Sequence, residues 1–309
     1  MRTIRFLGAS VFAVALVVVL GTADAGGGAA PLAITHPPRI PVAPFGGGIR
    51  ATWASSNWSG YAETGHYTAV NASWTVPTVT PGANSGGSGG GGGFRFGRRG
   101  PAPQSAWYSA TWTGIDGFND ANLIQAGTEQ DYYSGSAHYS AWWEILPAAE
   151  TVIPKPVSPG DSITALIAQT PTQVSVPSGR STVSEYEWTI TLTDTSTAHA
   201  SWTYTITQPY AGAGTSAEWV VEAPDVNGST ATIADYDFPT QSASSGDFNT
   251  AKVATSIGGP LSGAGLNFAN DAGTLIQNNQ QVSTPGQPDF AQTAFNSLYG
   301  ATAPGQPTS

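Results

Sequence analysis

The sequence predicts an all-β protein in which antiparallel sheets pack face to face as a sandwich. Three observations support this fold class. Short runs of alternating polar and apolar residues recur along the chain, clusters of Gly, Pro, Asn and Ser separate them, and helical periodicity is scarce. The 309 residues include 10 Trp, 11 Tyr and 11 Phe, which is enough apolar material for one large core.

Residues 1–25 are typical of a secretory signal peptide. Arg2 and Arg5 form a basic start, and residues 6–20 are nearly continuous apolar sequence. Residues 23–25, Ala-Asp-Ala, match the small-x-small pattern at which signal peptidase cuts. The apolar run is short for a membrane span. We therefore expect a secreted, extracellular protein that does not associate with a membrane.

The rest of the chain divides by composition. Residues 26–54 are rich in Gly, Pro and Ala and are expected to be a propeptide or a linker. One domain is expected over residues 55–300. Within it, the Gly-rich residues 81–104 are expected to form a surface loop. Residues 301–309 have the composition of a disordered tail.

The clearest strand signal is a hairpin. Residues 185–192 and 201–206 alternate polar and apolar with a period of two, and residues 194–200 supply a turn between them. Further strands are expected at residues 67–76, 106–113, 138–145, 163–169 and 218–222. Residues 289–299 are the best candidate for a short helix.

The composition excludes several functions. A formal net charge of −10 makes the protein a poor ligand for nucleic acid, because phosphate binding depends on Lys and Arg. The chain has no cysteine and therefore no disulfide and no thiol nucleophile. Most of its polarity comes from uncharged side chains, which suits acidic conditions because free carboxylates titrate near ~4. An ordinary acidic exoprotein would share this composition.

Familiar catalytic motifs are also missing. The four histidines, which are scattered and are interpreted as surface residues, are His36, His66, His138 and His199. No His-Glu-x-x-His spacing and no Asp-Thr-Gly or Asp-Ser-Gly pair occurs. A Gly-x-Ser-x-Gly match at residues 86–90 lies in a glycine run without a preceding strand or a following helix. No metal or cofactor is expected.

Polar side chains lie on three of the expected strands. Alternation places Gln125 and Glu129 on one face of their strand, and Trp142 with Glu144 on one face of theirs. Glu218 and Glu222 likewise share a face. If these faces line one concave sheet, they form a groove with a polar floor and aromatic walls. A groove of this kind could cut peptides or bind glycans.

Five segments that contain these residues, in their order and spacing, resemble the eqolisin family of glutamic peptidases. The segments are Ser56–Tyr61 (SNWSGY), Thr111–Gly117 (TWTGIDG), Leu123–Gly127 (LIQAG), Tyr139–Glu144 (YSAWWE) and Ser216–Glu222 (SAEWVVE). The resemblance covers about residues 55–238 well and the remainder loosely. It implies a concanavalin A-like or jelly-roll-like sandwich with a concave substrate groove.

The resemblance also implies site residues. It assigns the catalytic pair to Glu218, as general base and acid on water, and to Gln125, as the donor that stabilises the oxyanion. It assigns substrate binding to five further residues, namely Trp112, Asp116, Glu129, Trp142 and Glu144. This chain departs from the family pattern at Ser140, where an aspartate is usual, and at Leu146, where a tyrosine is usual. Cysteines of the fungal members are also missing.

The resemblance implies a pepstatin-insensitive acid endopeptidase that acts on protein or peptide substrates. With the signal peptide, we expect the enzyme to be secreted, and we expect a monomer. Two alternatives remain from the residues alone. A sandwich with paired carboxylates and aromatic platforms could be a glycan-binding or glycoside-hydrolysing module. A non-catalytic surface or matrix protein with Gly-rich spacers is the other.

Overall fold

A computed structural model describes residues 33–44, 51–82, 106–238 and 247–307. Its secondary structure is almost entirely β, which confirms the predicted all-β class. The predicted signal peptide and residues 83–104 of the Gly-rich segment lie outside the described residues. Among the residues described, no helix is long and apolar enough to cross a membrane.

The larger of the two main sheets has ten strands, and its neighbouring strands pair antiparallel except for β2, which runs parallel to β19. In spatial order the strands are β21 (Ser297–Tyr299), β20 (Gln280–Pro285), β19 (Ala272–Gln277), β3 (Trp58–Thr64), β13 (Ser216–Glu222), β6 (Ala110–Ile115), β7 (Ile124–Tyr133), β8 (Ser136–Ile145) and β9 (Thr151–Ile153), with β2 (Trp53–Ser55) beside β19.

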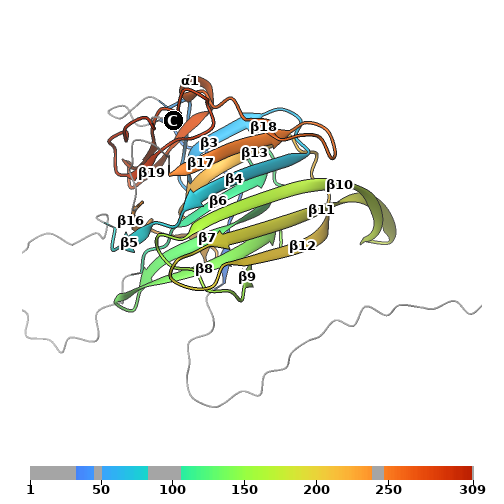
Figure 1. Cartoon of the computed structure of the whole chain (residues 1–309), viewed down its shortest axis with the longest axis horizontal. Helices are drawn as coiled ribbons and strands as arrows, with labels where there is room; N and C mark the ends of the chain where they lie inside the picture. The colour runs from blue at the N-terminus through green and yellow to red at the C-terminus, as the bar shows by residue number, and fades with distance from the viewer. Residues whose placement is uncertain (1–32, 45–50, 83–105, 239–246, 308–309) are drawn as a thin grey trace, which may run out of the picture. The chain divides into compact units, whose positions relative to one another are not determined.

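The second main sheet has six strands and is drawn towards the viewer in Figure 1. Its order is β12 (Trp202–Tyr210), β11 (Ser181–Thr195), β10 (Ser162–Ser178), β4 (Ala69–Thr75), β17 (Phe248–Ala254) and β18 (Ser262–Gly263). The smaller elements are β1 (Ile34–Thr35) with β14 (Asp225–Val226) and β15 (Ser229–Thr230), β5 (Thr78–Thr80) with β16 (Asp235–Asp237), and the four-residue helix α1 (Phe268–Asp271).

The predicted hairpin is confirmed and is longer than the pattern indicated. Strand β11 pairs with β12 so that Leu192 faces Tyr204 across the ladder. Trp188, Ile190 and Leu192 are buried, as the period of two requires. The other five predicted strands correspond to β4, β6, β8, β10 and β13.

The main hydrophobic core lies between the two sheets. Alternate residues of the larger sheet, such as Ala126, Ala141 and Trp219, pack with alternate residues of the smaller sheet, such as Trp74 and Ile190. The opposite faces of the same strands in the larger sheet therefore point away from this core. Those faces carry the predicted site residues.

One structural prediction near the C-terminus was wrong. Residues 289–299 form no helix, because Asp289 Oδ1 accepts hydrogen bonds from the backbone N–H groups of Thr293 and Ala294, and the chain then enters β21. The side chain satisfies these amides in a turn, which competes with a helix. Residues 301–307 are the described part of the predicted disordered tail, and Asn296 Nδ2 donates to Gly305 O there at 2.7 Å. Disorder of the tail stays a prediction.

Candidate active site

The site residues converge because four neighbouring strands of the larger sheet present alternate positions on one face. The register of β13, β6, β7 and β8 aligns Glu218, Gly114, Gln125 and Glu144 in one row. Four residues further along each strand, Glu222, Ala110, Glu129 and Ser140 form another row. Since the side-chain period of a strand is two, both rows face the same side.

Tryptophans occupy the middle of this face. Trp112 and Trp142 lie between the two rows, and Trp58 packs edge-on against Trp112 with ring centroids 4.9 Å apart. Gly127 separates Trp112 from Trp142, and a Cβ there would come within 2.5 Å of Trp112 Cβ. Only glycine therefore lets the two indole side chains approach each other across β7. Together these side chains form an apolar cluster outside the main core.

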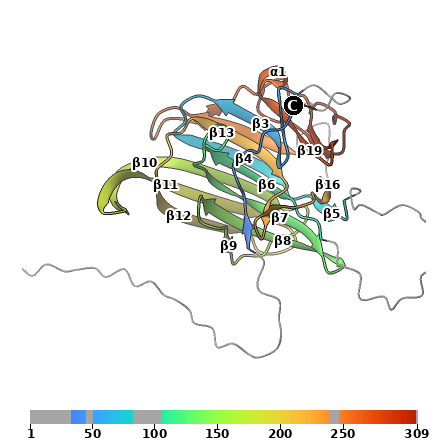
Figure 2. The ribbon, with the colours of Figure 1, turned by 180° about the vertical axis from the view of Figure 1, so that it is seen from behind.

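Residues 33–44, which we call the N-terminal segment, cover this face. Figure 2 shows the segment, drawn in blue, running across strands of the larger sheet. Its strand β1 pairs with β14, and Ile40 N donates to Asn57 Oδ1 at 2.8 Å. Residues 33–44 of the predicted propeptide or linker thus lie over the predicted groove. This contact explains why site side chains such as Gln125 and Glu222 are fully buried.

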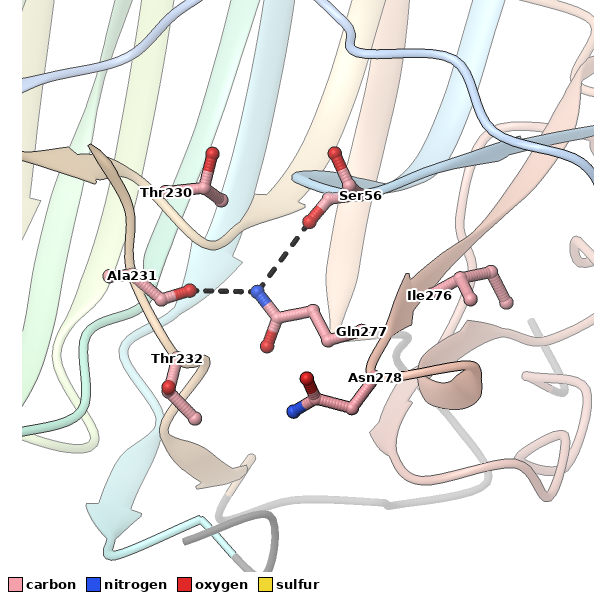
Figure 3. A pocket seen from close by; sticks show the side chains of 7 residues that line it. All are labelled: Ser56, Thr230, Ala231, Thr232, Ile276, Gln277 and Asn278. Atoms are coloured by element: carbon pink, nitrogen blue, oxygen red, sulfur yellow. Dashed lines mark hydrogen bonds between the residues drawn. The ribbon is translucent and has the colours of Figure 1, made fainter. Parts of the chain in front are cut away.

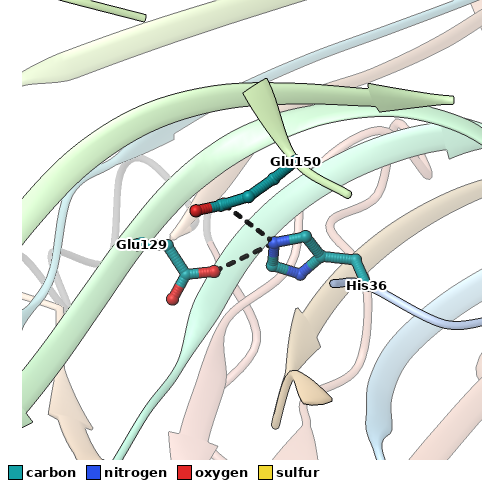
Figure 4. A group of neighbouring side chains, drawn as sticks. All are labelled: His36, Glu129 and Glu150. Carbon is teal, nitrogen blue, oxygen red and sulfur yellow. Dashed lines mark hydrogen bonds and ion pairs between the residues drawn. The ribbon is translucent and has the colours of Figure 1, made fainter. Parts of the chain in front are cut away.

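His36 of the N-terminal segment is the residue that enters the site. Its imidazole stacks on the indole of Trp142, with centroids 3.6 Å apart and planes 4° from parallel. Figure 4 shows the contact of His36 with Glu129. The Nε2 to Glu129 Oε1 distance is 3.0 Å, and the Nδ1 to Glu222 Oε2 distance is 3.0 Å. The interpretation of His36 as a surface residue was wrong, because its side chain is fully buried.

Gln125 contacts the backbone of the same residue. Its Nε2 donates to the carbonyl oxygen of His36 at 2.7 Å and to Glu144 Oε2 at 2.7 Å. The backbone N–H of His36 donates to the same Glu144 oxygen at 3.0 Å. Burial raises the pKa of Glu144 to about 8, although the charge and N–H of His36 oppose the shift. This carboxyl group is therefore protonated in acid.

Glu222 accepts hydrogen bonds from several donors. Trp112 Nε1 donates to Oε2 at 2.7 Å, and Trp58 Nε1 donates to Oε1 at 3.2 Å. Burial raises the pKa of Glu222, whereas His36 and the two indole N–H groups oppose that shift. These donors stabilise the ionised carboxylate more than the neutral acid.

Glu218 lies on the same face of β13 as Glu222 but has different surroundings. Its side chain is fully buried, and neither carboxylate oxygen has a hydrogen-bond partner among the described residues. Burial raises the pKa of Glu218 well above its usual value; the nearby Ser216 side chain opposes the shift, and the negative charges of Asp116 and Asp120 add to it. The net effect favours the neutral acid.

Asp116 follows β6, with a positive φ of 68°, and organises the chain around it. Its Oδ2 accepts from Tyr210 O–H at 2.8 Å and from Gly214 N at 3.0 Å. Its Oδ1 accepts from Thr215 N at 2.6 Å. Both oxygens are thus engaged in bonds that hold the loop preceding β13. The predicted role of Asp116 in substrate binding stays a prediction.

Glu129 lies next to a second buried carboxyl group. Burial raises the pKa of Glu129, and contact with His36 opposes the shift. Asp131, two residues further along β7, also has a pKa well above its usual value because it is buried beside Glu129. The pair therefore binds protons at a higher pH than free carboxyl groups would.

Among the residues that the structure describes, two groups of side chains have ligand atoms close enough to hold a metal ion. One is His36, Glu129 and Glu150 (Figure 4), and the other is Asp161, Asp194 and His199. In the first group, the ion pairs that His36 makes with Glu129 and Glu150 explain why these side chains lie close together. In the second, His199 Nε2 contacts Asp161 Oδ2 at 2.9 Å, so a protonated imidazole neutralises the carboxylates there.

A separate pocket lies outside the groove, and Figure 3 shows that the Gln277 side chain points into it. It is lined by Ser56, Thr230, Ala231, Thr232, Ile276, Gln277 and Asn278. Gln277 Nε2 donates to Ala231 O at 2.7 Å. None of the lining side chains is titratable, so the pocket lacks the groups for acid–base catalysis.

The structure therefore brings Gln125, Glu129, Trp142 and Glu144 together around His36 and places Trp112 beside them through Glu222. Glu218 lies in the same row as Gln125 and Glu144, with Gly114 between it and Gln125, and Asp116 lies beyond that row, past the end of β6. The motif-based assignment did not include Glu222 or Glu150 as site residues, nor His36. Glu222 could have been recognised from its shared face with Glu218, whereas no pattern in residues 26–54 indicated His36.

The chain was compared with protein-family models, curated proteins and solved structures. A family model described as the Peptidase A4 family matches residues 56–288. The comparison with curated proteins gave no match. Among solved structures, the chain is similar to the crystal structure of aspergilloglutamic peptidase from Aspergillus niger, with 22% sequence identity and a TM-score of 0.42, over 62% of this chain and 99% of that chain. The matched family region contains every predicted site residue and excludes the N-terminal segment.

Proposed function

The chain belongs to the Peptidase A4 family, and from this membership we propose that it is a secreted acid endopeptidase that hydrolyses peptide bonds with a glutamate and glutamine pair. The reaction would use water as the nucleophile and need no metal or cofactor. Family membership also favours a peptidase over the glycan-binding and matrix-protein alternatives.

One observation carries the proposal. The protein holds a piece of polypeptide, its own N-terminal segment, with a main-chain carbonyl on the amide of Gln125. That contact measures 2.7 Å, within the range for a hydrogen bond to a carbonyl oxygen. An amide placed there would donate to the negative oxygen that forms when water attacks such a carbonyl. A fixed donor of this kind contributes roughly 3 kcal/mol.

The remaining steps need one carboxylate. An ionised glutamate of β13 would take a proton from water, and the water oxygen would bond to the carbonyl carbon. Gln125 would stabilise the oxyanion. The glutamate would then return the proton to the leaving nitrogen as the carbon–nitrogen bond breaks. Glutamine does not titrate, so its N–H groups remain donors at any working pH.

Two glutamates are candidates for the base. The family resemblance assigns Glu218. The contacts favour Glu222, because it touches the peptide segment and accepts the indole N–H groups of Trp112 and Trp58. A base must be ionised to act, and contacts with His36 and the two indoles oppose the rise in the pKa of Glu222 that burial causes, whereas only Ser216 opposes the rise for Glu218, whose pKa lies well above its usual value. We therefore propose Glu222 as the base and retain Glu218 as the alternative.

Buried carboxyl groups support activity and stability in acid. Burial raises the pKa of Glu144 to about 8 and that of Asp247 to about 7. Such groups are neutral in acid and cost no ionisation energy there. Because the folded-state pKa of each group is raised, Glu144 and Asp247 contribute stability in acid that is lost as the pH rises through those values.

We also propose that residues 26–54 act as a propeptide. The N-terminal segment occupies both Gln125 and Glu222, so a substrate needs it to be displaced or removed. The region matched by the family model begins after it, at residue 56.

The test uses the purified full-length protein, incubated in acid and then given denatured casein at about pH 3, with and without pepstatin. Pepstatin-resistant cleavage that is abolished by Gln125→Ala and by Glu222→Gln supports the proposal. Glu185→Gln, a change on β11 in the other main sheet, serves as the matched control. Failure to cleave casein, combined with retention on a polysaccharide column, would refute the peptidase proposal.

A further inference from the structure

The pocket around His36 surrounds its ring with acidic groups. One ring nitrogen faces Glu129 at 3.0 Å and Glu150 at 3.4 Å, and the other faces Glu222 at 3.0 Å. A neutral imidazole has one donor and one acceptor nitrogen, so a carboxylate at each nitrogen requires the doubly protonated ring. Burial alone would lower the pKa of His36, but the three carboxyl groups raise it well above its usual value.

The shape of the pocket suits a flat cation. The imidazole lies parallel to the Trp142 indole at 3.6 Å, which is within the distance at which a cation and an aromatic face attract each other. All four groups around the ring belong to residues that follow the N-terminal segment. The larger sheet supplies three of them, Glu129 from β7, Trp142 from β8 and Glu222 from β13, and Glu150 directly precedes β9. Removing the segment would therefore leave the pocket intact.

The position of the pocket relates it to a cleaved bond. The carbonyl oxygen that accepts from Gln125 belongs to His36, and the backbone N–H of the same residue donates to Glu144. The side chain in the pocket is thus that of the residue whose carbonyl would be attacked. In the N-terminal segment the next residue is Pro37, which has no backbone N–H.

We propose that this pocket selects substrates with a flat cationic side chain, histidine or arginine, at the residue that contributes the carbonyl of the cleaved bond. This substrate class rests on the proposed peptidase function. Arginine fits because its guanidinium is planar and stacks on aromatic rings. A neutral side chain of the same size would leave Glu129, Glu150 and Glu222 without a cation.

The experiment uses the full-length chain carrying His36→Ala, whose pocket the segment no longer fills. The substrates are internally quenched peptides that copy residues 33–39 with alanine in place of Pro37. They carry His, Arg, Gln or Leu at the position of His36. The measurement is kcat/KM for each peptide at about pH 5, where a free imidazole is charged. Contact with such a cation lowers the pKa values of Glu129 and Glu222 and so favours their ionised forms.

We expect kcat/KM for the His and Arg peptides to exceed that for the Gln peptide by at least about tenfold, because bonds between charged groups are worth more than ~1.4 kcal/mol. Adding Glu129→Gln should reduce this ratio towards one, and Glu150→Gln, at a less buried position, should do the same if the first variant folds poorly. Glu185→Gln should leave the ratio unchanged.

Rapid cleavage of all four peptides with equal kcat/KM overturns the pocket assignment and leaves the peptidase function standing. Cleavage of neither casein nor any peptide overturns the function. In that case calorimetric titration with the His and Gln peptides tests the assignment of the pocket independently of catalysis. Tighter binding of the His peptide supports the assignment, and equal binding overturns it.

Discussion

Replacing His36 with alanine should unmask activity in the unprocessed chain. The imidazole joins the N-terminal segment to Glu129, Glu150 and Glu222 and stacks on Trp142. Alanine removes these contacts but leaves the backbone bonds to Gln125 and Glu144 possible. The segment should therefore stay attached to the sheet more weakly, and the site should open more often.

The size of the effect follows from the two closest contacts, each 3.0 Å long, to Glu129 and Glu222. A hydrogen bond to a charged group contributes about 1.5–3 kcal/mol, so two at the low end of the range give about 3 kcal/mol. Each ~1.4 kcal/mol is a factor of ten in an equilibrium constant. The open fraction of the unprocessed chain should thus rise about a hundredfold.

The assay is the initial rate of cleavage of a short quenched peptide, read within the first minute after dilution to about pH 5, before the segment is cut. The unprocessed wild-type chain should show a lag, and the His36→Ala chain should start without one. His36→Gln, which keeps a polar side chain but has no charge, should behave like His36→Ala. Equal initial rates and equal lags in wild type and both variants would refute an inhibitory contact through His36.

Three further outcomes are expected. Glu222→Gln should lower kcat for casein cleavage by about 10²–10⁴-fold, as expected for loss of a general base. Glu218→Gln should change kcat only a few-fold. A larger loss of kcat in Glu218→Gln than in Glu222→Gln would identify Glu218 as the base. Thermal unfolding followed between about pH 8 and about pH 4 should show rising stability as the pH falls. The pKa of Glu144 is raised to about 8 and that of Asp247 to about 7, so both groups bind protons in the folded state at a pH where the unfolded chain has lost them. This stability is complete below the unfolded pKa and is lost as the pH rises through the folded pKa, so a melting temperature that falls steadily with acid would contradict the shifts. Asp161→Ala should lower the free energy of unfolding by about 2 kcal/mol, because Asp161 accepts from Ser158 N at 2.6 Å and contacts His199 Nε2 at 2.9 Å. Circular dichroism melts, with Glu185→Gln as the control variant, would measure this loss of stability.

The strands were predictable because their signal is local. Residues 185–192 alternate with a period of two, and the structure pairs the strand that contains them with β12, the second strand of the predicted hairpin. The absence of the predicted helix at residues 289–299 was not predictable, because it depends on backbone N–H groups donating to Asp289 and on pairing of β21 with β20. Those contacts join residues that local periodicity does not relate.

The site was predictable in part for the same reason. Alternation alone places Gln125 with Glu129, and Glu218 with Glu222, on one face of each strand. It does not say which strands are neighbours, and it does not distinguish the surroundings of Glu218 from those of Glu222. Register across β13, β6 and β7 decides both, because pairing sets which side chains lie in one row.

The sequence by itself determined the all-β class, the polar strand faces and the family, because alternation and motif spacing are properties of neighbouring residues. The tertiary structure decided that residues 33–44 lie across those faces and that His36 stands between Glu129 and Glu222. His36 and Glu222 are 186 residues apart in the chain. Their contact depends on sheet pairing and on burial of charge, which no local pattern expresses.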